Sequence, residues 1–219
     1  GYIFKRFDRF KEETERSLNR YLYYIALPSL IFTKTLKIDI KTLDYHFIIL
    51  NILPIITVQL IIFLLYKGGI FSSLFAKTLI IISTLGNTVY LGFPVISLLI
   101  GDNYVSYGAL SSSIQNISVF IFGITLVNIM DDGDKINVFK NIIKNPLIIS
   151  SFVSIIFAYF SIDLYPVIIK PLEEIGKTTF GVSLFTLGMS IEYKGIISTK
   201  LSQLMISFFF KMLLLPLIP

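Results

Sequence analysis

The chain has 219 residues, of which 54% are hydrophobic and 15% are charged, and its net charge is +5. Soluble domains carry about 25% charged residues, so this composition predicts an integral membrane protein. The chain has no Cys and one His, which excludes disulfides, thiolate metal sites and iron–sulfur clusters, as well as paired-histidine haem and most zinc sites. We therefore expect no cofactor and no metal, and we interpret the positive charge as basic cytoplasmic loops rather than as nucleic-acid binding.

The chain begins with residues 3–18, where phenylalanines at helical spacing alternate with lysines and arginines. This pattern is typical of an interfacial helix or of a solvated helical loop between two membrane spans. Seven apolar stretches follow, each predicted to be a membrane helix because about 20 apolar residues cross a bilayer. They cover residues 18–36, 46–66, 74–100, 104–129, 146–161, 172–191 and 201–219. Asn145 before Pro146 predicts a capped start for the fifth stretch.

The distribution of Lys and Arg among the loops predicts the orientation of these helices. Of the 19 cations, thirteen lie in one set of loops, five lie in the opposite set, and Lys211 lies in the last stretch. Because cations gather in cytoplasmic loops, residues 131–144 are predicted to be cytoplasmic and residues 101–103 external. The third stretch then starts at the cytoplasmic side and ends outside.

The third stretch contains an unusual run of residues that predicts a broken helix. Gly86 and Gly92 weaken helix on either side of Asn87. Pro94 has no amide hydrogen, and its ring clashes with the carbonyl of Tyr90. We therefore predict two half-helices joined by an unwound segment at Gly86, Gly92 and Pro94. Such a break must be buried in protein or line a wet cavity, and transporters place substrate sites there; the alternative is a kink that serves packing alone.

The residues around this break predict a binding site for an anion. Asn87 offers an amide donor where the second half-helix begins, and that end carries partial positive charge and free amide hydrogens. Thr88 and Tyr90 add hydroxyls. Asn116, in the fourth stretch, is predicted to face the same cavity. The alternative for Asn87 is a cap of its own broken helix, and the alternative for Asn116 is a hydrogen bond between helices.

The ionisable residues of the apolar stretches also bear on which function classes are possible. Lys211 indicates function because an intramembrane Lys is costly, and a purely peripheral position is an equally open alternative. No Asp or Glu lies deep in any stretch and the lone His lies at an edge, which argues against an intramembrane hydrolase. No glycine-rich phosphate loop is present, which argues against ATP hydrolysis. We expect that the protein is not an enzyme.

One internal similarity suggests a repeat. Residues 28–33 (PSLIFT) are echoed by residues 182–186 (VSLFT). The two segments are five spans apart, so their directions in the membrane are inverted. Inverted repeats are a feature of transporters.

Four motifs, taken together, resemble a known family. They are LPSLIF at 27–32, GNTVYLGFPV at 86–95, NPLI at 145–148 and LFTLGMS at 184–190. In this order they resemble the auxin efflux carrier family, which includes the plant PIN-FORMED exporters and many prokaryotic transporters. In the plant members the asparagine after the first break contacts the substrate carboxylate, and Asn87 matches it. The plant members also use an Asp and a Lys in the third helix, where this chain has Asn51, Pro54 and Gln59.

The resemblance implies an all-α integral membrane protein of ten helices, built as two inverted repeats of five. The fourth and ninth helices are broken and cross near the membrane centre. On this basis we expect residues 1–219 to be one transporter domain truncated at both ends. The first repeat covers about 1–130, the cytoplasmic loop 131–144, and the start of the second repeat 145–219.

These observations together predict a secondary transporter of the efflux type. It would move a small organic anion, a carboxylate, across the cell membrane by alternating access. Its partners would be the lipid bilayer and the substrate, with a homodimer left open and no nucleic acid. The alternative is a non-transporting scaffold or subunit of a larger membrane complex, which explains the apolar stretches but not the break.

Because the chain has no native Cys, single-cysteine labelling tests the predicted orientation. Asp132→Cys is expected to react with a membrane-impermeant reagent only after the cells are permeabilised. Asp102→Cys is expected to react in intact cells. The opposite labelling pattern would overturn the orientation and the cytoplasmic start of the third stretch.

Overall fold

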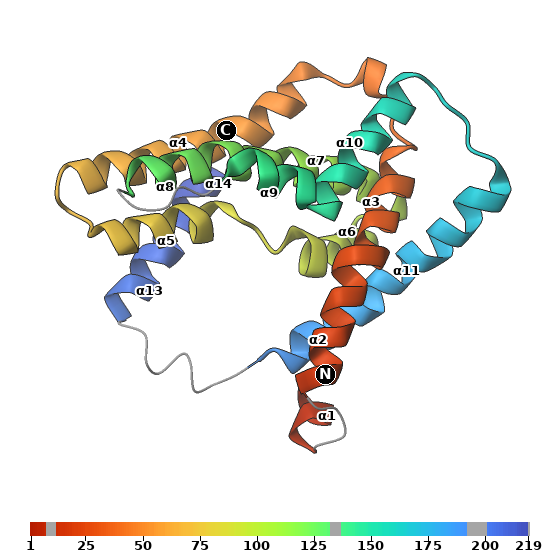
Figure 1. Ribbon diagram of the computed structural model, residues 1–219, viewed down its shortest axis with the longest axis horizontal. Coiled ribbons are helices and arrows are strands. Elements are labelled where there is room, and N and C mark those ends of the chain that lie inside the picture. The colour runs from red at the N-terminus through yellow and green to blue at the C-terminus, as the bar shows by residue number, and fades with distance from the viewer. Residues whose placement is uncertain (8–11, 132–136, 192–200, 219) are drawn as a thin grey trace. The chain divides into compact units, whose positions relative to one another are not determined.

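The computed structural model describes residues 1–7, 12–131, 137–191 and 201–218, and every regular element in these ranges is helical (Figure 1). The predicted all-α class is therefore confirmed. Parts of the predicted N-terminal helix and cytoplasmic loop, including Asp132, lie outside the described residues, as do Lys194 and Lys200. The arrangement as ten helices in two inverted repeats stays a prediction.

The chain divides into two compact units, each assembled from three segments. Unit 1 comprises Gly1–Leu43, Asn87–Ser113 and Asn145–Lys194, and unit 2 comprises Asp44–Gly86, Ile114–Lys144 and Gly195–Pro219. The predicted repeat boundary near residue 130 falls inside unit 2 and stays a prediction.

Unit 1 contains the N-terminal helices, the second half of the third stretch, the first part of the fourth stretch, and the helices that cover the fifth and sixth stretches. In chain order its elements are α1 Tyr2–Arg6, α2 Glu12–Tyr21, the π-helical turn η1 Leu22–Ala26, α3 Leu27–Thr35, η2 Ile40–Thr42, the π-helical turn η3 Thr88–Gly92, α6 Phe93–Leu99, η4 Asp102–Tyr104, the first part of α7 Val105–Ser118, α10 Pro146–Tyr159 and α11 Pro166–Met189. Its core is an apolar cluster to which η1, α3, η3, α6 and α7 contribute, with Phe93 and Leu22 completely buried.

Unit 2 is built on the antiparallel pair α4 and α5. Its elements are α4 Tyr45–Lys67, α5 Ser73–Thr84, the second part of α7, the π-helical turn η5 Val119–Gly123, α8 Ile124–Ile129, α9 Val138–Lys144, α13 Leu201–Phe208, the π-helical turn η6 Phe209–Leu214 and α14 Leu215–Leu217. Its apolar core includes Val58, Ile62, Ile80 and Phe210. A buried polar contact joins α4 to α5, where the Gln59 amide donates to Thr84 Oγ1 over 3.0 Å.

Local side-chain contacts explain where several helices begin. The carboxylate of Asp44 accepts from the amide of His46 at the start of α4. This hydrogen bond, with a second from the His46 ring, holds the pKa of Asp44 below its usual value. Asn145 accepts from the amides of Leu147 and Ile148 at the start of α10, so its predicted role as an N-cap is confirmed. These caps satisfy amides that have no partner inside the helix.

Proline explains three of the four π-helical turns among the described residues. Each of the three ends two residues before a proline that lies in the first turn of the next α-helix: η1 before Pro28, η3 before Pro94 and η6 before Pro216. In an α-helix the proline ring clashes with the carbonyl four residues earlier. A π-turn bonds five residues apart and is wider, so the chain continues through the proline without a sharp break.

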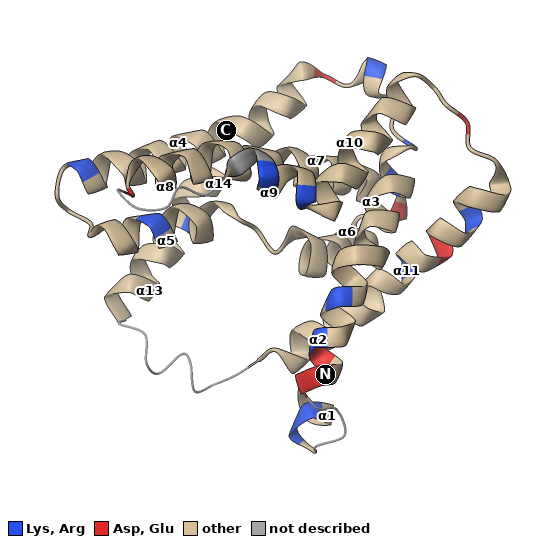
Figure 2. Cartoon of the chain, in the orientation of Figure 1, with Lys and Arg blue, Asp and Glu red and all other residues tan. Residues whose placement is uncertain are grey.

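Three helices of the described chain are long and apolar enough to cross a membrane: Tyr45–Lys67, Ser73–Leu99 and Asp102–Ile129. Pro146–Tyr159 and Leu201–Leu217 are shorter apolar helices. The other two predicted stretches lie in helices that are less apolar. Figure 2 shows acidic and basic residues along α11, which begins at Pro166, six residues before the predicted start.

A close backbone approach between α3 and α11 in unit 1 is made possible by a glycine. A Cβ added at Gly176 of α11 would lie 3.0 Å from Leu30 Cα and 3.2 Å from Leu30 N in α3. Small residues at such contacts let membrane helices approach closely. The packing of α3 against α11 therefore depends on Gly176.

Gly176→Ala is expected to lower the free energy of unfolding by about 1–3 kcal/mol, because the added methyl meets backbone that cannot move aside. Gly181→Ala, in the same helix, is the matched control because a Cβ there meets nothing within 4 Å. It is expected to be neutral or to stabilise by up to about 1 kcal/mol. Equal unfolding midpoints for the two variants in detergent would contradict the close approach.

Candidate functional site

The third apolar stretch is interrupted at residues 85–87. The first half-helix, α5, ends at Thr84, and Leu85 is extended with φ −83° and ψ 105°. Helical backbone resumes at Thr88 in η3 and continues through α6. The chain passes from unit 2 to unit 1 between Gly86 and Asn87, so the two half-helices belong to different units.

The interruption is shorter than the sequence predicts. Gly86 lies inside it, but Gly92 is the last residue of η3 and Pro94 lies in the first turn of α6. The physical reason is the π-helical turn η3, which accommodates the proline ring and keeps the chain helical. The break is therefore formed by residues 85–87 rather than by the longer segment that extends to Pro94.

Asn87 lies at the start of the second half-helix, and its side chain is exposed. Its backbone carbonyl accepts from the amides of Leu91 and Gly92, each over 3.2 Å. Its side chain makes no capping hydrogen bond. The structure therefore does not show the alternative in which the Asn87 side chain caps its own half-helix.

The two predicted hydroxyls hold the second half-helix against its neighbours in unit 1. Thr88 Oγ1 lies 3.0 Å from Ser112 Oγ in α7. The Tyr90 hydroxyl donates to Asn19 Oδ1 in α2 over 3.4 Å. Both contacts position the turn that follows Asn87, and nothing in the sequence singles out Asn19.

Asn116 is the fourth predicted site residue, and it belongs to unit 2. It is half-buried in the part of α7 that follows Ser113. Asn87, Thr88 and Tyr90 lie within one turn of unit 1. The predicted role of Asn116 at the cavity stays a prediction.

Ser183, a buried residue of α11, is a hydrogen-bond donor to the Tyr90 carbonyl, to which Pro94 cannot donate. Pro94 has no amide hydrogen to donate to the Tyr90 carbonyl four residues earlier. Ser183 Oγ lies 3.2 Å from that carbonyl and 3.2 Å from the carbonyl of Phe180 in its own helix, so its one hydrogen is shared between the two acceptors. Ser183 lies in the segment that echoes residues 28–33, but the sequence contains no signal for this contact because it joins residues 93 positions apart.

The first half-helix also has a partner, within unit 2. Nζ of Lys211, in η6, donates to the carbonyls of Ile82 and Leu85 over 3.1 Å and 3.0 Å. These are the carbonyls that the interruption leaves at the C-terminal end of α5. The amine at this end is the cation that a helix C-terminus favours.

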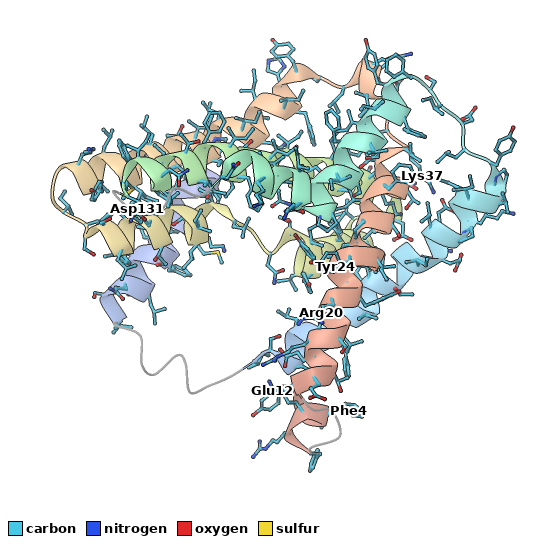
Figure 3. The ribbon with its side chains drawn as sticks, in the orientation of Figure 1. Phe4, Glu12, Arg20, Tyr24, Lys37 and Asp131 are labelled. Atoms are coloured by element: carbon cyan, nitrogen blue, oxygen red, sulfur yellow. The ribbon has the colours of Figure 1, made fainter. Side chains whose placement is uncertain are left out.

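Unit 1 holds a cavity of about 390 Å³ between α3, α6 and α11, and three lysines line it. Lys37, labelled in Figure 3, pairs with Glu173 over 2.8 Å. Lys177 pairs with Glu174 over 2.6 Å. Nζ of Lys34 donates to the backbone carbonyl of Asp102 over 3.3 Å. The cavity is therefore a polar, partly charge-compensated pocket at the end of the unit that is predicted to be external.

Comparison with known proteins establishes the family. Residues 1–139 match a family described as membrane transport protein, and the chain belongs to this family, the auxin efflux carriers. It is therefore a multi-pass membrane protein of a transporter family and not an enzyme. An uncharacterized transporter of Methanocaldococcus jannaschii is 29% identical over 204 residues, which cover 90% of this chain and 66% of the relative. The chain thus spans 66% of that relative's length.

Ser183→Ala is expected to lower the free energy of unfolding by about 1 kcal/mol, because it removes a shared hydrogen bond to the partly buried carbonyl of Tyr90. Ser150→Ala is the control, since the Ser150 hydroxyl donates to the Leu147 carbonyl of its own helix. Thermal unfolding of the purified variants measures both effects. A Ser183→Ala midpoint equal to that of the control would show that the contact with Tyr90 does not stabilise the break.

Proposed function

We propose that this protein is a secondary transporter of the efflux type, which moves a small organic anion across the cell membrane by alternating access. Its membership of a membrane transport family supports the transport step. The observation that carries the choice of an anion is the start of the second half-helix at Asn87. The loop at residues 131–144 is proposed to be cytoplasmic, from the distribution of cations.

The physical argument for an anion rests on the end of the helix. The second half-helix runs from Thr88 to Leu99 as η3 and α6. Its first amides point away from the helix and carry about half a positive charge in total. A carboxylate at this position accepts those hydrogen bonds and meets that charge. The exposed side-chain amide of Asn87 adds one more donor beside it.

Thr88 and Tyr90 are proposed to contribute to the same substrate site. A hydroxyl has one donor hydrogen and two acceptor positions. The Tyr90 hydroxyl donates its one hydrogen to Asn19, so it can only help to position the site. Thr88 Oγ1 can donate to a carboxylate when Ser112 Oγ is the donor in their pair. The main role of Thr88 and Tyr90 is to hold the first turn of the half-helix, so that Asn87 keeps its orientation when substrate binds.

The division into two units suits alternating access. In this mechanism one bundle of helices moves against another around a fixed site. The chain passes between units at Asn87, in a non-helical stretch that can absorb changes in backbone angles. We therefore propose that residues 85–87 absorb the change in backbone angles during the transport cycle.

Asn87→Ala removes a hydrogen bond to a charged group, which is worth about 1.5–3 kcal/mol. The expected result is a roughly tenfold to hundredfold loss of affinity for a transported carboxylate. The variant should fold normally, because the Asn87 side chain makes no capping contact. Transport of a panel of carboxylates by the full-length protein in vesicles, with binding measured on the purified protein, identifies the substrate and measures the loss.

The matched control is Asn103→Ala, which removes an exposed amide in the turn between α6 and α7. It is expected to leave affinity unchanged. Unchanged affinity in a well-folded Asn87→Ala protein would refute the role of Asn87. If the wild-type protein transports none of the carboxylates, the non-transporting scaffold becomes the better explanation.

A further inference from the structure

The contact of Lys211 with α5 is specific in its geometry. Its Nζ lies 3.1 Å from the carbonyl oxygen of Ile82 and 3.0 Å from that of Leu85, and all three residues belong to unit 2. Figure 1 shows α13, which leads into η6, beside α5. Within the described part of the chain, no carboxylate pairs with Lys211. The charge of this ammonium is therefore balanced by carbonyl dipoles.

The end of α5 is a place where a cation is needed. The last carbonyls of any helix lack partners inside it and carry partial negative charge. Here the chain turns away at Leu85 in an extended conformation, so no further turn of helix covers them. In transporters with broken helices, the carbonyls at such ends coordinate a coupling Na⁺ or proton. In this chain an ammonium group lies at that position.

Packing, and not only its charge, holds Lys211 at this position. The preceding residue, Phe210, is 5% exposed and belongs to the core of unit 2. Its ring lies 6.4 Å from that of Phe71. The π-helical turn η6 contains both Phe210 and Lys211. Replacing Lys211 by an apolar residue of similar length should therefore leave η6 in place and remove only the cation.

We propose that the carbonyls of Ile82 and Leu85 form part of a site for a small monovalent cation, and that Lys211 fills this site with a cation built into the chain. The ligand class is a cation with N–H donors or an alkali-metal ion, since both bind carbonyl oxygens. The site itself rests on the contacts in unit 2. One consequence rests on the proposed function: the transport cycle requires no dissolved cation at the end of α5.

The test replaces Lys211 by Met in the full-length protein, because Met matches the Lys stem and leaves only the space of the ammonium group. The Lys211→Met variant is expected to unfold at a midpoint lower than wild type by roughly 2–4 °C. Ammonium chloride is expected to restore most of this loss. Tetramethylammonium chloride, which has the same charge but no N–H donor, is expected to restore little at equal ionic strength. Wild type is expected to respond equally to both salts.

Two further variants serve as controls. Lys211→Arg keeps a cation with N–H donors and is expected to stay near the wild-type midpoint. Lys170→Met removes one exposed cation of α11 and is expected to respond equally to the two salts. If Lys211→Met unfolds at the wild-type midpoint, or if both salts restore it equally, the proposal is wrong.

If Lys211→Met does not fold in plain buffer, the cation site can still be tested. The variant is then purified in the presence of either salt. Recovery of folded protein with ammonium alone supports the site, and recovery with neither salt contradicts it. These measurements follow unfolding and do not depend on transport, so failure of the cation site and failure of the proposed function are distinguishable.

Discussion

The hydrogen-bonding demand of a broken helix in an apolar environment shapes both units of this protein. An interruption at residues 85–87 leaves carbonyls at the end of α5 and amides at the start of η3. Lipid offers no hydrogen bonds, and each group left without a partner costs several kcal/mol. The structure meets the two ends differently. Lys211 donates to two of the carbonyls, those of Ile82 and Leu85, whereas the amides at the start of η3 are where a substrate anion is proposed to bind.

A π-helical turn before a proline is a feature that recurs in both units. Proline would interrupt each long helix, yet η1, η3 and η6 each precede one and keep the chain helical. Where a carbonyl still lacks its usual donor, a side chain from another helix supplies one, as Ser183 does for Tyr90. The real break is thereby confined to three residues. A short break beside rigid half-helices is better suited to absorbing a change in backbone angles than a long flexible segment would be.

The packing of unit 1 explains why so many of its buried residues are small or polar. Ser, Thr and Gly at the contacts of α3, α10 and α11 permit close approach, as at Gly176 against Leu30. Membrane helices gain no hydrophobic driving force from one another, so close packing and hydrogen bonds hold them together. The pair Ser113 and Ser151, whose hydroxyls lie 2.7 Å apart, joins α7 to α10 in this way.

The sequence alone determined the membrane class, the all-helical fold, three of the seven predicted spans, the N-cap at Asn145, the family and the position of the break near Gly86. All of these depend on composition, local spacing or backbone preferences, which act between neighbouring residues. Only the tertiary structure showed that Gly92 and Pro94 lie in helical turns, that Asn87 does not cap its own helix, and that Ser183 and Lys211 serve the break. Lys211 lies 129 positions from Ile82. No local pattern can predict a hydrogen bond over such a separation, because it exists only once the helices have packed against one another.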